Sequence, residues 1–371
     1  MRAIFVLGSF ELGGAERQAL LLARYLAEER RAQAEVWAFG ERGRAADLCR
    51  QHGIPIRSIP PLPRARVPRA MAVLKFALAL RSAKPDVILP YTLLPNVMCG
   101  LVWRMTGAKT CIWNQRDEGL WRGRQSTERW AVRFTPRFIS NSEQGAHFLV
   151  HTLGVRTERV KVVWNGISLT PPRDDLKTWR ERLGVNGPCF VACMVASLSE
   201  FKDHGTLLKA WRRVADQLHA TNQEALLLLA GRFGSVTESL RSLTHKLGLD
   251  NQVRFLGDVE DVSGLLAASD IGVFSSRSEG CPNGVLECMA AGLPVAATDT
   301  AGIRDVVGAG SAGYLAAPDD AESLAMKIVT LATDPDLRAR LGAQNRQRVE
   351  TEFNPRQMCE QTVAWFDNVV G

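Results

Sequence analysis

Short apolar runs alternate with segments of helical periodicity along most of the chain. The first run, residues 4–8, predicts a strand, and a turn with two glycines follows it. Residues 15–29 then predict a helix, because apolar side chains recur there at every third or fourth position. Further strands of the first half are predicted over residues 35–39, 86–89, 109–113 and 137–140. Strands that alternate with helices are typical of a parallel sheet with right-handed crossovers.

The alternation is interrupted near residue 170 and then begins again. Residues 170–175 contain two adjacent prolines, which supply no backbone donor and fix φ, so this segment predicts a linker. Beyond it, strands are predicted over residues 190–195, 225–230, 253–256, 271–274 and 294–297, and helices over 206–218, 236–247, 262–268 and 285–291. Helical pattern fills residues 321–371, with helix starts at Pro335 and Pro355.

These two series predict an α/β protein with two Rossmann-like domains, each a doubly wound parallel sheet. A length of 371 residues is too great for one core and suits two domains. The predicted domains are residues 1–170 and 171–354, and residues 355–371 form a C-terminal helix that packs back towards the N-terminal domain. Ligands of such sheets bind at the carboxyl ends of the strands.

The charge of the chain is uneven. The net charge is +7, but residues 1–170 hold 26 basic and 13 acidic side chains, a balance of +13, whereas residues 171–371 hold 20 and 26, a balance of −6. The basic excess therefore belongs to one half and indicates an anionic partner for it. With 46% hydrophobic and 23% charged residues, the composition excludes disordered and fibrous classes.

Cysteine spacing and hydropathy indicate a cytoplasmic protein. The eight cysteines form no C-x-x-C pair and no zinc-type cluster, which predicts buried, reduced thiols. The apolar run at the start is too short for a signal peptide, and no stretch approaches the roughly 18 apolar residues that span a bilayer. Residues 63–84 are basic and amphipathic. They either pack on their own sheet or lie on the inner face of the cytoplasmic membrane, held by anionic lipid.

The densest cluster of candidate functional residues is the segment 275–287, which follows a predicted strand and leads into a helix. Glu279 lies in the loop and Glu287 in the first turn of the helix. The amides of residues 283–286 point outward there and favour an anion or a sugar hydroxyl. The alternative is that Glu287 only complements the helix dipole.

Two other strand-to-helix loops carry candidate chemistry. Lys202 lies in the loop of residues 195–205, where its ammonium can lie beside a diphosphate; the alternative is a solvated loop lysine. Gly13 and Gly14 allow the backbone to approach a ligand closely. Alone they are weak evidence, because the turn lacks both the G-x-G-x-x-G pattern and a P-loop.

The segment from Glu279 to Glu287, with residues 288–295 and 298–305 after it, resembles the signature of retaining glycosyltransferases of family four. The resemblance extends in order over nearly the whole chain and also covers residues 13–17, 140–143, 163–167, 202 and 253–259. It implies the GT-B fold, in which two Rossmann-like domains face a central cleft that holds the active site. The N-terminal domain is then the acceptor side, and the C-terminal domain binds the nucleotide sugar.

The resemblance implies transfer of a sugar from a UDP- or GDP-type nucleotide diphosphate sugar to a glycan or lipid-linked acceptor, with retained anomeric configuration. It further implies no cofactor and no metal, and a place in surface polysaccharide, lipopolysaccharide or glycolipid biosynthesis. By the family pattern Lys202 and Glu279 are catalytic: Lys202 neutralises the departing diphosphate, and Glu279 holds the hydroxyls of the transferred sugar. The residues that the resemblance places at the donor are Gly13, Gly14, Ser197, Lys202, Arg232, Glu279, Gly280, Pro282, Asn283, Gly284 and Glu287.

The chain departs from the family pattern in three places, one of which is Ser168, where the family usually has an aspartate. Ser197 stands where the family usually has an arginine, so Arg232 and Arg277 are the candidates for phosphate neutralisation, with a solvated surface arginine as the alternative for each. Tyr91 stands where the family often has a histidine, which argues against histidine-based activation of the acceptor. The candidate acceptor-side residues are Tyr91, Asn114, Arg116 and Asp117, with a packed loop network as the alternative interpretation.

Three rival functions remain open on the sequence. A nucleotide-sugar epimerase of the same fold needs no acceptor, and a degenerate sugar-binding protein needs no catalysis. A module that binds nucleic acid or a membrane would use the basic half. We expect a nucleotide diphosphate sugar, an acceptor glycan or lipid and an anionic membrane as partners, and no nucleic acid.

Overall fold

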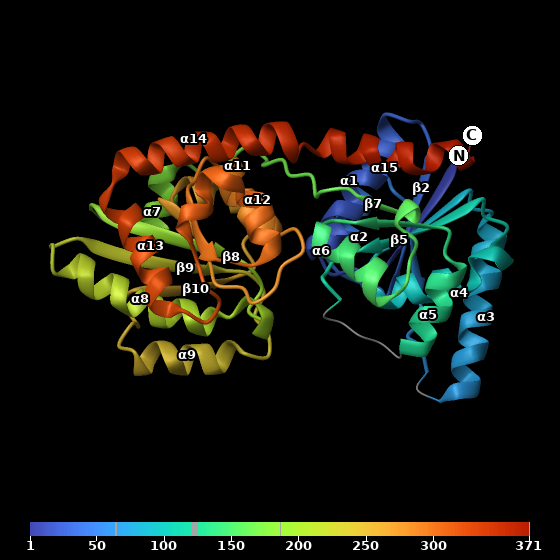
Figure 1. Cartoon of the computed structure of the whole chain (residues 1–371), viewed down its shortest axis with the longest axis horizontal. Coiled ribbons are helices and arrows are strands. Elements are labelled where there is room, and N and C mark those ends of the chain that lie inside the picture. Colours follow the sequence, from blue (N-terminus) through green and yellow to red (C-terminus); the bar gives the residue numbers. More distant parts are fainter. Residues whose placement is uncertain (64, 120–124, 186, 371) are drawn as a thin grey trace. The chain divides into compact units, whose positions relative to one another are not determined.

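The computed structural model describes residues 1–63, 65–119, 125–185 and 187–370. The chain divides into two compact units. Residues 1–166 and 355–371 form the first, and residues 167–354 form the second. Each unit contains one sheet, and all strand pairs in both are parallel (Figure 1).

The sheet of the first unit has seven strands in the order β3-β2-β1-β4-β5-β6-β7. Their bounds are β1 (Arg2–Leu7), β2 (Gln33–Phe39), β3 (Ile56–Ile59), β4 (Val87–Pro90), β5 (Thr110–Gln115), β6 (Arg137–Ser140) and β7 (Val160–Val162). The order reverses direction between β1 and β4, which is the doubly wound arrangement that the alternation predicts.

Helices cover both faces of this sheet. They are α1 (Gly14–Glu28), α2 (Arg44–Gln51), α3 (Arg66–Ala83), α4 (Leu93–Thr106), α5 (Gln125–Phe134), α6 (Glu143–His147) and α15 (Pro355–Val370), with short turns η1 (Phe148–Thr152) and η2 (Thr157–Arg159). On one face, Phe76 and Leu80 of α3 and Met98 of α4 pack against Ile4 and Val6 of β1. On the other face, α1, α2 and α15 share a core with the alternate residues of the same strand.

The sheet of the second unit has six strands in the order β10-β9-β8-β11-β12-β13. Their bounds are β8 (Cys189–Val195), β9 (Glu224–Ala230), β10 (Val253–Gly257), β11 (Ile271–Phe274), β12 (Val295–Thr298) and β13 (Leu315–Ala316). The helices are α7 (Leu176–Leu183), α8 (His204–His219), α9 (Thr237–Lys246), α10 (Val262–Ala267), α11 (Asn283–Ala290), α12 (Ala301–Ser311), α13 (Ala321–Thr333) and α14 (Pro335–Glu352), with turns η3 (Glu200–Lys202) and η4 (Ala312–Tyr314). Helix α8 packs against α13, and α11 packs against α14.

The structure confirms the two doubly wound parallel sheets and every strand that the sequence predicts. The sequence misses β3, β7 and β13. All three lie at an edge of their sheet, are two to four residues long and are partly exposed. An edge strand of this length buries few side chains, so its apolar run is too weak to be recognised.

The boundary between the units lies at Gly166 rather than at residue 170. The side chain of Gln18 donates to the carbonyl of Gly166 and accepts from its amide, both at 3.0 Å, which holds Gly166 to α1. The proline-rich segment is not a free linker: the amide of Asp174 donates to Asp261 at 3.3 Å within the second unit. Proline content predicted a break in regular structure but not which unit holds the segment.

Candidate functional site

Lys202 and Glu279 meet in the second unit, on loops that follow two neighbouring strands. Lys202 ends the turn η3 after β8, and Glu279 lies in the loop after β11. The Lys202 Nζ atom is 2.5 Å from the Oε1 atom of Glu279, and Ser276 Oγ donates to the same oxygen at 2.6 Å. The side chain of Glu279 is 9% exposed and that of Lys202 is 25% exposed. The site is therefore a largely desolvated carboxylate held by one cation and one hydroxyl.

The sheet topology explains this contact between residues 77 positions apart in sequence. Strands β8 and β11 pair in parallel, so their carboxyl ends lie at the same edge of the sheet. The loops that leave those ends therefore meet, as they do in open α/β sheets that bind ligands at this edge. The sequence predicted the position of each residue after a strand, but it did not predict the ion pair.

The N-terminus of α11 lies directly against the end of β8. Pro282 is the residue before the helix, and Gly284 lies in its first turn. A Cβ atom on Gly284 would lie 2.1 Å from the carbonyl oxygen of Val195, so only glycine allows this approach. Gly280 is buried, Asn283 is half-buried, and Glu287 in the same helix is 5% exposed. The amides at the start of α11 are thus close to the loop that carries Lys202.

The loop after β9 also reaches this edge. The amide of Leu198 donates to the carbonyl of Arg232 at 3.0 Å, and a Cβ atom on Gly231 would lie 2.1 Å from the carbonyl oxygen of Ala196. Ser197 and Arg232 are both exposed there. The structure therefore brings the second-unit candidates of the sequence to one edge of one sheet, on the loops after β8, β9 and β11.

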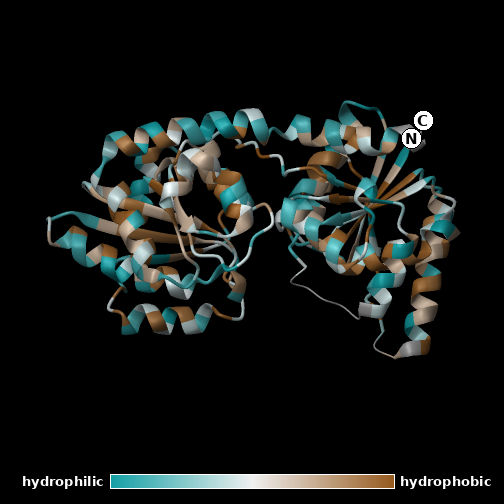
Figure 2. Cartoon of the chain, viewed as in Figure 1, coloured by the Kyte–Doolittle hydropathy of each residue, from teal (hydrophilic) through white to brown (hydrophobic). Residues whose placement is uncertain are grey.

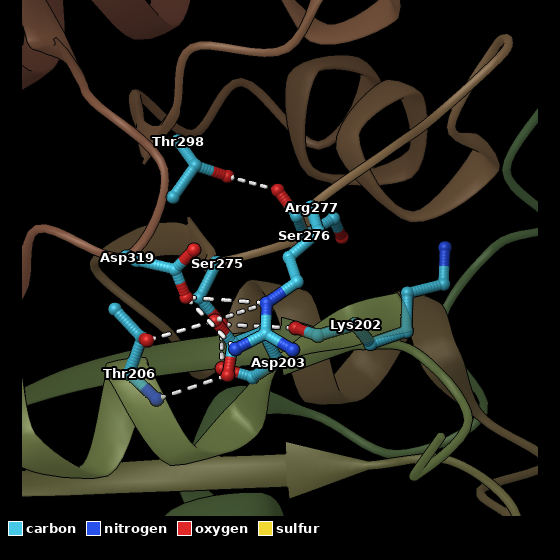
Figure 3. Close-up of polar contacts among 8 residues, drawn as sticks. All are labelled: Lys202, Asp203, Thr206, Ser275, Ser276, Arg277, Thr298 and Asp319. Carbon is cyan, nitrogen blue, oxygen red and sulfur yellow. Dashed lines mark hydrogen bonds and ion pairs between the residues drawn. The ribbon is translucent and has the colours of Figure 1, made fainter. Parts of the chain in front are cut away.

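Arg277, the other candidate for phosphate neutralisation, contacts two carboxylates. Its guanidinium lies 3.3 Å from Asp203 and 2.8 Å from Asp319 (Figure 3). These contacts raise the pKa of Arg277 and lower that of Asp319, because each ion stabilises the charge of the other. The sequence had assigned no role to Asp203, Ser275, Ser276, Thr298 or Asp319, because each is an ordinary loop residue until the loops meet.

Gly13 and Gly14 belong to the first unit, at the start of α1. Gly13 precedes the helix, and its amide donates to the carboxylate of Glu16 at 3.2 Å. Glu16 is buried to the same extent as Glu279, at 9% exposure. This turn therefore presents a carboxylate beside the two glycines.

The four acceptor-side candidates form one cluster in the first unit. The guanidinium of Arg116 stacks on the ring of Tyr91 at 4.6 Å and donates to the side chains of Asn114 at 3.1 Å and Asn165 at 3.0 Å. Tyr91 and Asn114 are fully buried, and burial raises the pKa of Tyr91. Tyr91 and Asn114 thus lie in the core, where they contact Arg116. Arg116 and Asp117 are partly exposed.

A narrow pocket adjoins this cluster. Its lining residues are Thr92, Leu93, Asn96, Trp113, Gln115, Arg116, Asp117, Glu128, Phe148 and Leu153. Gln115 donates to Asp117 at 2.9 Å, and Asn96 exchanges two hydrogen bonds with the backbone of Asn114. Sequence reasoning missed Asn96 and Asn165. Asn165 could have been found from the sequence, because it lies in the segment 163–167 that resembles the family.

Neither a metal-ligand cluster nor a membrane-spanning helix occurs in the described ranges. No three His, Cys, Asp or Glu side chains there are arranged to hold a metal ion. No described helix is long and apolar enough to cross a bilayer. All eight cysteines are free, and seven of them are buried, in agreement with the expected reduced thiols.

Comparisons with known families agree with the fold. Residues 12–170 match the family described as Glycosyltransferase Family 4, and residues 175–348 match the family described as Glycosyl transferases group 1. The chain belongs to glycosyltransferase family 4. The Lys202–Glu279 pair and the start of α11 lie within the group 1 match, and the Arg116 cluster lies within the other.

Curated relatives of the chain include several proteins named as glycosyltransferases. The chain is 28% identical over 232 residues to the putative glycosyltransferase EpsD of Bacillus subtilis. This match covers 59% of the chain and 58% of EpsD. The chain is 29% identical over 220 residues to the D-inositol 3-phosphate glycosyltransferase of Streptomyces scabiei, with 57% and 49% covered. The chain thus spans about half the length of the curated relatives it matches.

Solved structures match over the whole fold. The Alr3699/HepE protein of Anabaena in complex with UDP-glucose is 25% identical, with a TM-score of 0.86 over 99% of this chain and 100% of that one. WaaG, a glycosyltransferase involved in lipopolysaccharide biosynthesis, is 18% identical with a TM-score of 0.75 over the full length of both chains. The two Rossmann-like units are therefore those of GT-B glycosyltransferases.

Proposed function

We propose that this protein transfers a sugar from a UDP- or GDP-sugar to a hydroxyl of a glycan or lipid-linked acceptor, with retention of the anomeric configuration. The product belongs to a surface polysaccharide, lipopolysaccharide or glycolipid. The observation that carries the proposal is the Lys202–Glu279 ion pair at the carboxyl edge of the second sheet, beside the N-terminus of α11.

The proposed chemistry follows from the charge that develops during the reaction. As the bond between the sugar and the diphosphate breaks, negative charge grows on the leaving phosphate and positive charge on the sugar ring. The Lys202 ammonium and the amides at the start of α11 stabilise the phosphate. Glu279 accepts hydrogen bonds from sugar hydroxyls, and its negative charge lies beside the cationic ring. The leaving phosphate accepts the acceptor proton on the same face, which retains the configuration.

The relatives support a nucleotide diphosphate donor and a surface-glycan product. The 25% identical Anabaena protein binds UDP-glucose in one structure and UDP in another. A further relative, 33% identical over 121 residues, is the lipopolysaccharide core biosynthesis glycosyltransferase LpsE of Rhizobium meliloti. That match covers 33% of this chain and 36% of the relative, so it supports the class of product rather than a particular linkage.

A donor screen tests the proposal directly. We expect UDP or GDP to raise the melting temperature of the full chain, and the matching nucleotide sugar to be consumed when an acceptor is present. NMR of the product then reads the anomeric configuration. An inverted product or a trapped covalent glycosyl-enzyme contradicts the mechanism, and epimerisation of the donor without acceptor would assign the chain to the rival activity.

The proposed reaction needs no metal ion. Lys202 and the α11 amides supply the positive charge that a metal supplies in other transferases. We expect EDTA to leave the transfer rate unchanged and added Mg²⁺ or Mn²⁺ to give no activation. A rate that falls with EDTA and recovers with a divalent cation contradicts this part of the proposal.

The lipid-linked acceptor is proposed because α3 carries exposed apolar side chains with basic neighbours. Figure 2 shows that hydrophobic positions recur along this helix. Val67, Met71, Leu74 and Leu78 are 71%, 55%, 48% and 56% exposed, and their spacing places them on one face of the helix. Arg69, Lys75, Arg81 and Lys84 on or next to α3 are also exposed. Arg64 lies outside the described residues. Apolar insertion combined with basic charge fits the surface of an anionic membrane.

Liposome flotation tests this docking surface. We expect the protein to bind vesicles with anionic lipid and to bind neutral vesicles weakly, and Met71→Ser with Leu78→Ser to lower binding at least about tenfold. Met326→Ser on α13, an equally exposed apolar position of the second unit, is the matched control. Binding that is unaffected by the α3 variants, or independent of anionic lipid, contradicts the proposal.

A further inference from the structure

Three loops of the second unit meet at the guanidinium group of Arg277 (Figure 3). Its Nε atom lies 3.3 Å from an oxygen of Asp203, on the loop before α8. The Nε and Nη2 atoms donate to one oxygen of Asp319 at 3.1 and 2.8 Å, on the loop before α13. Arg277 itself follows β11, two residues before Glu279. One cation therefore joins the loop of Lys202, the loop of Glu279 and a third loop.

The backbone of the lysine loop is tied to the same place. The hydroxyl of Ser275 lies 3.0 Å from the carbonyl oxygen of Lys202 and 2.9 Å from that of Asp203. The amide of Arg277 donates to the carbonyl of Phe201 at 2.9 Å. Both the side chain and the main chain around Arg277 thus hold the turn that ends in Lys202.

Asp203 needs this support because its conformation is unusual. Its φ angle is +44°, a left-handed value that is strained in a residue other than glycine unless the surroundings hold it. Its carboxylate also accepts from the hydroxyl of Thr206 at 2.7 Å, in the first turn of α8. Only 9% of the side chain is exposed, so its charge depends on a nearby cation.

We propose that Arg277 is a positioning residue that fixes Lys202 against Glu279, rather than a ligand of the diphosphate. Its charge balances the carboxylates of Asp203 and Asp319, and the balance keeps the turn η3 closed on the loop after β11. The Lys202 side chain extends away from the guanidinium, which leaves the ammonium free of competition from it (Figure 3). The effect of Arg277 on sugar transfer rests on the function proposed above, whereas its effect on the position of Lys202 does not.

Removal of Arg277 has a distinctive expected effect. Asp203 and Asp319 both lie within 3.3 Å of the same nitrogen atom, so without the guanidinium they repel one another across the vacated space. The turn η3 opens to relieve that repulsion, and Lys202 loses its fixed place. Removal of Asp319 as well abolishes the repulsion, so the double variant is less disturbed than Arg277→Ala alone.

Lysine labelling of the nucleotide-free full chain tests the proposal without any substrate. The acetylation rate of Lys202 by acetic anhydride is measured by mass spectrometry relative to exposed Lys246 on α9. We expect Arg277→Ala to raise this ratio on the order of tenfold, Asp319→Ala to raise it less, and the double variant to fall back towards wild type. Arg277→Lys keeps the charge and is expected between wild type and Arg277→Ala. An unchanged ratio in Arg277→Ala, or a double variant as reactive as the single one, overturns the proposal.

Nucleotide binding separates the proposal from the phosphate-ligand hypothesis. If Arg277 binds the diphosphate, Asp319→Ala releases it and tightens UDP or GDP binding in calorimetry, and Arg277→Ala weakens binding without changing Lys202 labelling. For a positioning residue, Asp319→Ala does not tighten binding, and Arg277→Ala lowers kcat for the nucleotide sugar more than it raises KM. Wild-type protein that binds neither nucleotide contradicts the proposed function, and the labelling result still decides the role of Arg277.

Discussion

The carboxylate of Glu279 contacts the ammonium of Lys202 and the hydroxyl of Ser276 in a nearly buried site. A buried carboxylate without a cation is costly, so each member of the pair depends on the other. In the proposed reaction the two groups contact different parts of the bound donor. The ammonium binds the phosphate, and the carboxylate binds the sugar. The ion pair is then the arrangement without a bound donor.

Substitution of either partner is expected to lower the rate of catalysis strongly. Lys202→Ala and Glu279→Gln should each lower kcat about 10²- to 10³-fold, because each removes one group that stabilises charge in the transition state. Steady-state kinetics with the donor found by screening measures the effect. Lys209→Ala on the exposed side of α8 is the matched control and should retain wild-type kcat. Wild-type kcat in the Lys202 or Glu279 variant would remove that residue from the mechanism.

His204, next to the lysine loop, is expected to make stability depend on pH. Its side chain is 1% exposed, and neither ring nitrogen has a hydrogen-bond partner among the described residues. Burial, assisted by the charge of Lys202, lowers the pKa of His204 from 6.5 to about 4. The unfolded chain therefore binds a proton below pH 6.5 that the folded chain does not bind until about pH 4. Stability is fully present above pH 6.5 and falls by about 3 kcal/mol as the pH drops to 4.

Urea unfolding between pH 7 and pH 4 measures this dependence. His204→Leu should remove about 1.4 kcal/mol per pH unit from the slope between pH 6.5 and pH 4, because leucine takes up no proton. The His52→Leu variant, at an exposed position of the first unit, is the control for the substitution itself. An equal slope in wild type and His204→Leu contradicts the assignment.

At the scale of elements, glycines allow two close backbone approaches beside the site loops of the second unit. A Cβ atom on Gly302 in α12 would lie 2.0 Å from the carbonyl oxygen of Gly280 and 2.1 Å from that of Glu279. The glutamate loop therefore lies directly on the start of α12. Gly284 makes the corresponding approach to the end of β8. These two glycines set the distance between the site loops and the elements that support them.

Gly302→Ala is expected to lower both stability and activity. The methyl group would overlap backbone atoms that have no flexible side chain to move, which costs about 1–3 kcal/mol and displaces Glu279. Chemical denaturation and donor turnover measure the two effects. Gly313→Ala in η4 is the control, since a Cβ atom there meets nothing within 4 Å. Equal stability of the two variants would contradict the close packing at Gly302.

At the scale of the whole molecule, the first unit is completed by a helix from the other end of the chain. Met358, Cys359, Val363 and Phe366 of α15 are buried in the core of the first unit, together with residues of α1 and β1. Helix α15 contacts α1 and β5, and Arg137 donates to the carbonyl of Trp365 at 2.8 Å. The first unit is therefore discontinuous in sequence, and residues 167–354 form a continuous insertion in it.

Truncation after residue 354 is expected to destabilise the first unit and spare the second. The loss of four buried side chains and the cavity that they leave should cost at least about 5 kcal/mol. Calorimetry should show one transition at lower temperature and one unchanged. The full-length Phe366→Ala variant should shift the same transition by a smaller amount, corresponding to about 3–5 kcal/mol. A truncated chain that melts like the full chain contradicts this role of α15.

Local patterns in the sequence predicted the regular elements that are well buried. Strands such as β8 and β11 have four or more buried residues in succession, and burial is what makes an apolar run visible. The edge strands β3, β7 and β13 bury too little to be found in this way. The boundary at Gly166 was missed because the contacts of Gln18 and Pro355 with this residue join distant parts of the chain.

Patterns in the amino-acid sequence were enough to predict two α/β units, the family resemblance, and a lysine and a glutamate that each lie on a loop after a strand. They were enough because secondary structure and loop position depend on residues close together in the chain. The folded chain was needed to show that Lys202 contacts Glu279, that Arg277 contacts two carboxylates, and that Tyr91 and Asn114 are buried. These contacts depend on which strands are neighbours, and the strand order is set by crossovers and packing over the whole unit.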